Sequence, residues 1–334
     1  MAKKRSKSTY VIAGIVGVFA ILGIMLYVAS DSNLVTNLAY APGDKIDPID
    51  NVISDTAITA DDSNVSYGKN SEPLQRYDMY LPDNPNGNIM VHVHGGSWWW
   101  GDKQDQLNVD RAEVFSGKAS GRNAINADEH YAVAVINYRL QSATLQQQAD
   151  DVALAVKHVL ETYGSRYGTS QIILSGGSAG GHLAALVATD ESHLQNQGLS
   201  FANIKGVALL DAPALDLDLI RDSYKSFYHD VLEFAFGPLP QGEGTEYMNW
   251  IINSPKYHAD SAQNLPPILG LYSNWNAPIK NTTFSLLDAS NNDKDLSIIS
   301  WLWHEGTIIA SHEKGRIRDG NRRSDGVIDW MENL

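Results

Sequence analysis

The chain has 334 residues, a formal net charge of −14 and no cysteine. The lack of cysteine excludes a disulfide framework, a cysteine nucleophile, cysteine-ligated metal and lipidation at cysteine. Proteins that bind nucleic acid need a basic surface, so the acidic balance argues against such a partner. The length fits one α/β domain with a short appendage, because α/β domains often exceed about 200 residues around a single core.

The first 29 residues predict a membrane anchor. Residues 1–9 form a basic tip with four Lys or Arg residues, and residues 10–29 are an uncharged, mostly apolar run. A helix of that length spans about 30 Å, the thickness of the hydrocarbon core of a bilayer. Basic flanks stay in the cytoplasm, so the catalytic domain is expected outside it, in the periplasm or the extracellular space. Cleavage as a signal peptide near Val28-Ala29-Ser30, which would yield a secreted protein, is the alternative.

The remaining chain predicts a linker followed by a single catalytic domain. Residues 30–63 are polar and interrupted by Pro42, Gly43 and Pro48, as is typical of a linker. Residues 64–334 alternate apolar runs with helical patterns, which predicts an α/β domain with right-handed βαβ units and a mostly parallel sheet. Two edge strands are expected in the segment VSYGKNSEPLQRYDMYLPD, and further strands at 88–94, 131–138, 172–173, 206–211, 268–272 and 296–303. Helices are expected within 101–129, together with an insertion, at 145–163, after Gly180 and at 326–334. The aromatic-rich segment that extends to Asn264 either roofs the site or forms ordinary packed helices.

The segment QIILSGGSAGGHL, residues 171–183, carries the strongest functional signal. A short β-branched run ends in Gly176-Gly177-Ser178-Ala179-Gly180 and passes directly into a helical pattern. Strand, sharp turn and helix are the context that a G-x-S-x-G nucleophile elbow requires, with the serine at its apex. Ser178 is therefore the candidate nucleophile. The alternative is a Gly/Ser loop without chemical meaning.

A glycine-rich loop upstream supplies candidate donors for an oxyanion. His94-Gly95-Gly96-Ser97-Trp98 follows the strand predicted at 88–94. In such a position the N–H groups of Gly96 and Ser97 can face a reacting carbonyl, with the N–H of Ala179 as a third donor. The positive end of the helix after Ser178 would also favour the developing negative charge. The alternatives are a simple turn or a metal pair of His92 and His94, for which no third ligand is evident.

These motifs resemble those of a known family along nearly all of the chain from Val65. The order and spacing are similar to the esterase/lipase branch of the α/β-hydrolase superfamily, related to hormone-sensitive-lipase-like carboxylesterases, feruloyl and acetyl esterases and kynurenine formamidases. The resemblance implies a sheet of about eight mostly parallel strands flanked by helices, no cofactor and no metal, and ester hydrolysis through Ser178. The matching pieces are VSYG, YDMYLPD, HGGSWWWGDK, NYRL, DDVALAVKHV, GGSAGGHLAAL, SPKYH and LPPILGLYS.

The sequence departs from this family where the acid of a serine-acid-histidine triad is expected. That position falls on Asn276, and an amide there can hold the histidine in the wrong tautomer. Asp211, at the end of a predicted strand, is the candidate substitute, although it could instead be a helix cap or turn residue. The resemblance implies His312 as the base, with His304 as its competitor.

Three other features near these motifs have a structural interpretation. His182 is expected to pack rather than to act as a base, and Asp216 matches a position that is usually structural. The run of Trp98, Trp99 and Trp100 either lines an acyl pocket or packs in the core.

The main hypothesis is a membrane-anchored serine carboxylesterase that acts on small or medium acyl esters. A hydrolase-fold binding or scaffold protein with weakened catalysis is the alternative from another class, because of Asn276. An amidase or formamidase on the same fold is the third possibility.

Overall fold

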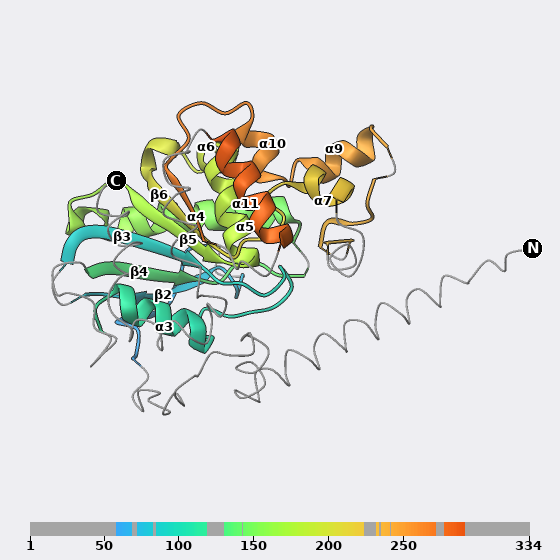
Figure 1. The fold of residues 1–334 in the computed structure, drawn as a ribbon. Helices are drawn as coiled ribbons and strands as arrows, with labels where there is room; N and C mark the ends of the chain where they lie inside the picture. Colours follow the sequence, from blue (N-terminus) through green and yellow to red (C-terminus); the bar gives the residue numbers. More distant parts are fainter. Residues whose placement is uncertain are drawn as a thin grey trace, which may run out of the picture. The chain divides into compact units, whose positions relative to one another are not determined.

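A seven-stranded, mostly parallel sheet forms the centre of the described part of the protein (Figure 1). The computed structural model describes residues 58–68, 72–82, 85–118, 130–141, 143–223, 232–233, 235–240, 242–271 and 277–290. All of them belong to one compact unit, Ile53–Leu334. The strands are β1 (Asp62–Ser66), β2 (Arg76–Tyr80), β3 (Pro85–Val93), β4 (His130–Ile136), β5 (Ile172–Gly177), β6 (Ile204–Leu210) and β7 (Ile268–Leu271).

The strand order is β1-β2-β4-β3-β5-β6-β7, with antiparallel pairing only for β1–β2 and β2–β4. The predicted α/β class and the mostly parallel sheet are confirmed. The strand expected at 296–303 and the helix expected at 326–334 lie outside the described residues. The crossover of β3 and β4 places β3 beside β5, so the loop after β3 and the turn after β5 leave the same edge of the sheet.

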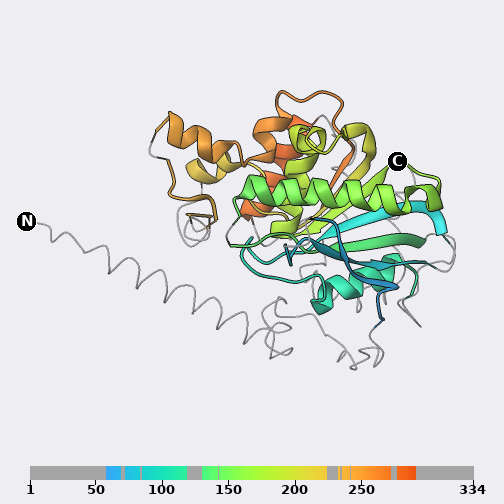
Figure 2. The ribbon, with the colours of Figure 1, turned by 180° about the vertical axis from the view of Figure 1, so that it is seen from behind.

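Helices cover both faces of the sheet. Figure 1 shows α4, α5, α10 and α11 on one face and α3 on the other, and Figure 2 shows the same layers from behind; α7 and α9 lie beside the helical layer. The helices are α3 (Gln106–Phe115), α4 (Leu145–Tyr167), α5 (Ala179–Thr189), α6 (Ser192–Gln195), α7 (Leu217–Ser223), α9 (Thr245–Ile251), α10 (Pro255–Ala259) and α11 (Ala277–Ala289), with a 3₁₀ turn, η2, at Phe201–Asn203.

The boundaries of α4 follow from its caps. Thr144 and Gln147 form a reciprocal capping box at the start, which satisfies two otherwise unpaired N–H groups. Gly168, with φ 64°, ends the helix in the left-handed conformation. The helix therefore runs four residues beyond the predicted end at Tyr163, because Gly164 is tolerated inside it and the stop signal is Gly168.

Two predicted boundaries near the sheet edge differ from the structure. β1 starts at Asp62, which pairs with Met79, so the sheet begins within the expected linker of residues 30–63. β3 starts at Pro85, three residues before the predicted start at 88, because Pro85 pairs with His130 and a register shift between Pro85 and Ile89 lets the strand continue past Gly87. Both differences reflect long-range pairing, which a local turn signal does not register.

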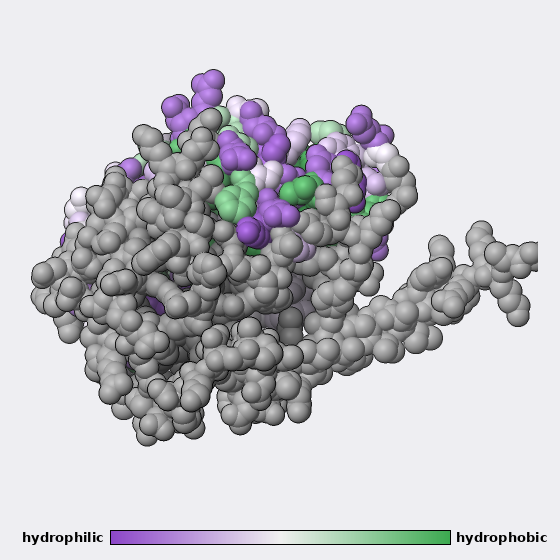
Figure 3. Space-filling view, viewed as in Figure 1, coloured by the Kyte–Doolittle hydropathy of each residue, from purple (hydrophilic) through white to green (hydrophobic). Residues whose placement is uncertain are grey.

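The core consists of strands that are buried on both faces. All seven residues of β4 and all six of β5 are buried. Burial on both faces explains why β4, HYAVAVI, is nearly continuously apolar rather than alternating. The described surface is mixed: hydrophilic and hydrophobic residues alternate where they are coloured in Figure 3. Among the described residues, the exposed large apolar side chains are Met248 and Tyr257.

The predicted membrane anchor, residues 10–29, lies outside the described ranges. Among the helices that the structure describes, none is both long enough and apolar enough to cross a membrane.

Candidate active site

Ser178 occupies a strained turn between β5 and α5. Its backbone has φ 52° and ψ −124°, a conformation that costs a non-glycine residue about 1–3 kcal/mol unless its surroundings hold it. The N–H of Ser178 donates to the carbonyl oxygen of Leu210 at the end of β6 (2.8 Å), and its own carbonyl accepts from the N–H of His182 (3.1 Å). The neighbouring residues 172–177 and 179–189 are buried, whereas Ser178 is exposed. The strand-turn-helix elbow predicted from the sequence is thus present, with its serine presented at the surface.

Glycine at the flanking positions is a steric requirement of this turn. A Cβ at Gly176 would lie 2.3 Å from the carbonyl oxygen of Gly180, and a Cβ at Gly180 would lie 2.2 Å from that of Val93. Side chains do not tolerate such contacts with backbone atoms. The two glycines of the G-x-S-x-G motif therefore allow β5, α5 and the end of β3 to meet at Ser178.

The loop after β3 passes directly beside Ser178. A Cβ added to Gly95 would lie 3.3 Å from the Cβ of Ser178. The loop turns through positive φ at Gly96 (117°), Ser97 (49°) and Trp98 (63°). The Gly96 carbonyl accepts from the N–H groups of Trp99 and Trp100, both at 3.0 Å. Two distant sequence motifs, HGGSW and GGSAGG, therefore meet at one place.

The predicted oxyanion donors lie in the two segments that meet at Ser178. Within the described part of the chain, the N–H groups of Gly96 and Ser97 donate to no backbone acceptor. Ala179 is the first residue of α5, where helical N–H groups lack an intrahelical partner and the helix dipole is positive. All three residues lie within two positions of either Gly95 or Ser178, which approach each other closely.

His94 and Tyr138 support the loop from below. Their rings stack with centroids 4.4 Å apart, and the Tyr138 hydroxyl donates to the His94 carbonyl (3.2 Å). The Nδ1 of His94 donates to the Gly95 carbonyl (2.6 Å). Burial lowers the pKa of His94, which favours the neutral ring. His94 therefore packs against the loop and holds it in place.

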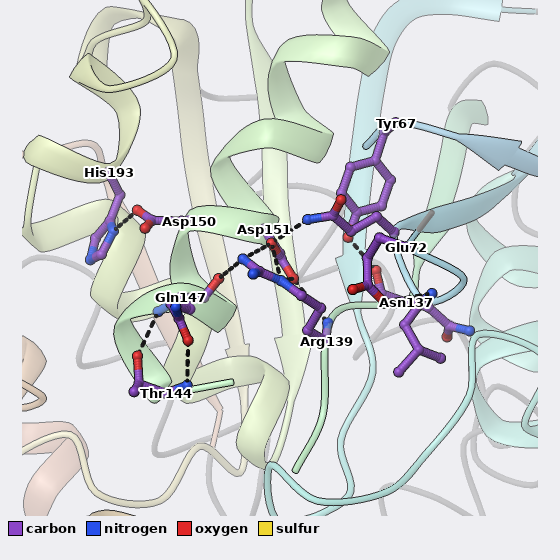
Figure 4. A network of polar contacts seen from close by, with 11 residues as sticks. Tyr67, Glu72, Asn137, Arg139, Thr144, Gln147, Asp150, Asp151 and His193 are labelled. Carbon is purple, nitrogen blue, oxygen red and sulfur yellow. Dashed lines mark hydrogen bonds and ion pairs between the residues drawn. The ribbon is translucent and has the colours of Figure 1, made fainter. Parts of the chain in front are cut away.

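The sequence segment NYRL, residues 137–140, also holds the loop after β3 in place, through a network of polar contacts (Figure 4). The Asn137 side chain donates to Asp102 Oδ2 (2.8 Å) and accepts from the N–H of Lys103 (2.6 Å), so it fixes the end of the HGGSWWWGDK segment. Arg139 binds the buried carboxylate of Asp151 on α4 through Nε and Nη2. The loop beside Ser178 is thus anchored to both β4 and α4.

A buried cluster of His92, Ser175 and Arg111 lies near the elbow on the α3 side of the sheet. His92 Nδ1 is 2.8 Å from Ser175 Oγ, and Nη1 of Arg111 is 3.2 Å from His92 Nε2. Burial holds the pKa of His92 well below its usual value, with Arg111 as a further cause. Both ring nitrogens of His92 therefore contact protein groups.

Asp211 lies at the same edge of the sheet as Ser178. It directly follows Leu210, whose carbonyl holds the N–H of Ser178, and its own N–H donates to the Leu271 carbonyl (2.7 Å). Asp211 is half-buried and has φ 49°, a strained conformation of the kind that clusters at functional sites. The other predicted triad residues, Asn276 and His312, and the competitor His304 lie outside the described residues.

Asp216 has structural contacts. Its carboxylate accepts from the N–H of Leu219 in the first turn of α7 (3.0 Å) and from the hydroxyl of Ser285 on α11. This arrangement agrees with the structural role expected for it.

The sequence reasoning missed one buried contact between the two motifs. Trp98 is 2% exposed, and its indole Nε1 donates to Nδ1 of His182 on α5 (3.2 Å). The second nitrogen of His182 is 2.8 Å from the Asn253 carbonyl, so this histidine packs as expected and is buried away from solvent. Trp98 consequently belongs to the core rather than to an acyl pocket, whereas Trp99 and Trp100 are half-buried.

Part of the chain matches a family model and a curated protein. Residues 77–219 match the BD-FAE family model. Over 138 residues the chain is 30% identical to a protein of Oryza sativa subsp. japonica named "Probable isoprenylcysteine alpha-carbonyl methylesterase ICME", a match that covers 40% of this chain and 30% of that protein. The chain therefore spans less than a third of the length of this curated relative.

Solved structures share the fold at low sequence identity. A truncated carbohydrate esterase from gut microbiota has a TM-score of 0.57 at 16% identity and covers 81% of this chain and 94% of its own. Esterase B from Lactobacillus rhamnosis has a TM-score of 0.52 at 21% identity, over 82% and 88% of the two chains. The same esterase inhibited by a tributyrin phosphonate has a TM-score of 0.51 at 21% identity, over 83% and 91%.

The described fold, a mostly parallel sheet flanked by helices, is shared with these solved esterases. The family-model match and the rice relative support the esterase family that the sequence motifs resemble.

The protonation of His182 leads to a prediction about pH. Burial lowers the pKa of His182 to about 4, against about 6.5 in an unfolded chain. Below pH 6.5 the His182 imidazole becomes protonated in the unfolded chain but stays neutral in the folded protein. The free energy of unfolding therefore falls as the pH decreases toward 4. The difference between the two pKa values corresponds to a loss of roughly 3 kcal/mol in the free energy of unfolding over this whole pH range. Urea unfolding of wild type and His182→Gln between pH 7 and 4 should show a steeper loss in the wild type. Equal slopes would contradict a buried neutral imidazole.

Proposed function

We propose that the protein is a serine hydrolase that cleaves carboxylic esters with small or medium acyl groups. The observation that carries the proposal is the exposed Ser178 in its strained turn, with the Gly95–Ser97 loop beside it. Acyl transfer through serine requires an accessible hydroxyl beside N–H donors for the oxyanion. Within the described residues, the N–H groups of Gly96 and Ser97 donate to no backbone acceptor. The rice relative is named as a methylesterase and two of the similar structures are esterase B, which supports ester bonds as the substrate class.

The proposed reaction has two steps. The Ser178 hydroxyl attacks the ester carbonyl carbon while His312 takes its proton, and the oxyanion is held by the N–H groups of Gly96, Ser97 and Ala179. The alcohol then leaves with the proton from His312, and an acyl-serine remains. Water attacks this acyl-enzyme with His312 again as the base, which releases the carboxylic acid and restores the serine.

Asp211 is our candidate for the group that orients the base. Its location at the end of β6, next to the residue that holds Ser178, and its strained backbone support this assignment. In this scheme Asn276 at the family's usual acid position is bypassed. His304 is the alternative base.

We further propose that residues 10–29 anchor the enzyme with its catalytic domain outside the cytoplasm. The basic tip followed by the uncharged run supports this proposal. Recovery of the full chain in the soluble rather than the membrane fraction, without removal of the first 29 residues, would contradict it.

Asn276 specifically favours a second candidate function, a hydrolase-fold binding protein with weakened catalysis. Turnover separates the two candidates, since a binding protein would hydrolyse p-nitrophenyl esters no faster than its own Ser178→Ala variant does. Comparison of formanilides with p-nitrophenyl acetate distinguishes an amidase from an esterase.

The nucleophile assignment predicts the effect of Ser178→Ala. Hydrolysis of p-nitrophenyl butyrate by the full chain should lose at least about three orders of magnitude in kcat, because the covalent step disappears. Ser192→Ala, at an exposed serine of α6, is the matched control and should retain wild-type kcat. Equal activity of wild type and Ser178→Ala would exclude Ser178 as the nucleophile.

The acid assignment predicts opposite outcomes at two positions. Asp211→Asn should reduce kcat by about two to four orders of magnitude, because an amide in this role holds the imidazole in the wrong tautomer. Asn276→Asp should change kcat by less than about tenfold. If Asp211→Asn leaves kcat untouched while Asn276→Asp raises it strongly, the acid belongs at position 276 and the natural chain has an impaired triad.

A further inference from the structure

His182 connects three segments that are far apart in the sequence. Its Nδ1 accepts from the Trp98 indole in the loop after β3 (3.2 Å), and its Nε2 meets the Asn253 carbonyl between α9 and α10 (2.8 Å). The Phe236 ring packs edge-on against both, 5.0 Å from Trp98 and 5.4 Å from His182. His182 has 0% exposure.

The two partners of His182 determine its tautomer. An indole N–H only donates and a carbonyl only accepts, so Nδ1 must be the bare nitrogen and Nε2 must carry the proton. A protonated ring would offer the Trp98 indole a second donor instead of an acceptor. The depressed pKa of His182, caused by burial, is in line with this neutral form.

The position of His182 on α5 links it directly to the nucleophile. It lies four residues after Ser178, and its N–H donates to the Ser178 carbonyl. The Trp98 residue that it holds is the neighbour of Ser97, a proposed oxyanion donor. A short path of contacts therefore joins the donors on the loop to the donor at the start of α5.

The loop itself needs such a restraint. Ser97 and Trp98 are consecutive non-glycine residues at positive φ, a conformation that persists only when the surroundings fix it. Gln148 of α4 holds the Trp98 carbonyl (2.9 Å), and Gln146 of the same helix holds the Asn253 side chain (3.2 Å). His182 hydrogen-bonds to both Trp98 and the Asn253 carbonyl, so it joins the two segments directly.

We propose that His182 is a positioning residue, which fixes the oxyanion loop against the Ser178 elbow through the Trp98 indole. The proposal rests on the serine hydrolase function above. Its consequence is kinetic: without this contact the N–H groups of Gly96 and Ser97 lose their alignment with the oxyanion, which exists only in the transition state. Such a loss lowers kcat and kcat/KM together and leaves KM unchanged.

The test uses three variants of the full chain with p-nitrophenyl butyrate. His182→Leu removes both hydrogen bonds, Trp98→Phe removes only the indole donor, and His182→Gln keeps one acceptor and one donor. We expect kcat to fall about 30- to 100-fold in the first two, with KM within about twofold, because displacing oxyanion donors costs rates of this order. His182→Gln should recover kcat to within about fivefold of wild type. The double variant His182→Leu/Trp98→Phe should be no slower than the slower single variant, because both single variants break the same Trp98–His182 hydrogen bond.

The matched control is His193→Leu on α6. His193 is similarly buried, but its described partners are Asp150 and Asp190, so kcat should stay at the wild-type value even if the melting temperature falls. A His182→Leu protein with lowered melting temperature and wild-type kcat overturns the proposal, as does a strictly multiplicative double variant. If His182→Leu does not fold, Trp98→Phe with unchanged kcat overturns it equally.

Titration of active sites with a p-nitrophenyl phosphonate distinguishes a failure of the positioning role of His182 from a failure of the proposed serine hydrolase function. If the wild-type protein neither hydrolyses the ester nor reacts with the phosphonate, both the proposed function and the role of His182 are wrong. A wild type that titrates normally, with a fully active Trp98→Phe, defeats only the role of His182.

Discussion

The strained turn at Ser178 is the constraint on which the rest of the site depends. A serine at φ 52° and ψ −124° stays in place because β6 holds its N–H and α5 begins immediately after it. Close packing of β5, β3 and α5 around Gly176 and Gly180 leaves no room for relaxation. The result is an exposed hydroxyl-bearing residue on an otherwise buried backbone, at the positive end of a helix.

The loop after β3, which carries two of the proposed oxyanion donors, depends on this turn and on a set of buried polar contacts behind it. Tyr138 stacks under His94, Asn137 fixes the residues after the tryptophan run, and His182 holds Trp98. Each contact satisfies a buried polar group that would otherwise be costly, so the same bonds that stabilise the fold also define the loop. The motifs HGGSWWWGDK, NYRL and GGSAGGHL thus have a common structural purpose, although they are separated along the chain.

Local sequence signals were sufficient for the elements that create the elbow. Glycine spacing around Ser178 and the buried runs of β3, β4 and β5 predicted the strand-turn-helix and the meeting of two glycine-rich loops. The contact of Trp98 with His182 spans 84 positions, and neither residue type announces a partner at that distance. The same limitation explains β1 and β3, whose starts at Asp62 and Pro85 depend on pairing with distant strands. Asn276 and His312 were assigned through family resemblance alone, and these assignments remain predictions.

The most direct test of the account is the site of covalent modification by a phosphonate ester. Trypsin should release residues 167–205 as one peptide, which carries Ser178 and four other serines, and fragmentation of that peptide locates the adduct. The account predicts one phosphonate per chain, on Ser178, and none in Ser178→Ala. An unmodified intact protein, or an adduct on any other serine, would contradict the central claim that this elbow carries the nucleophile.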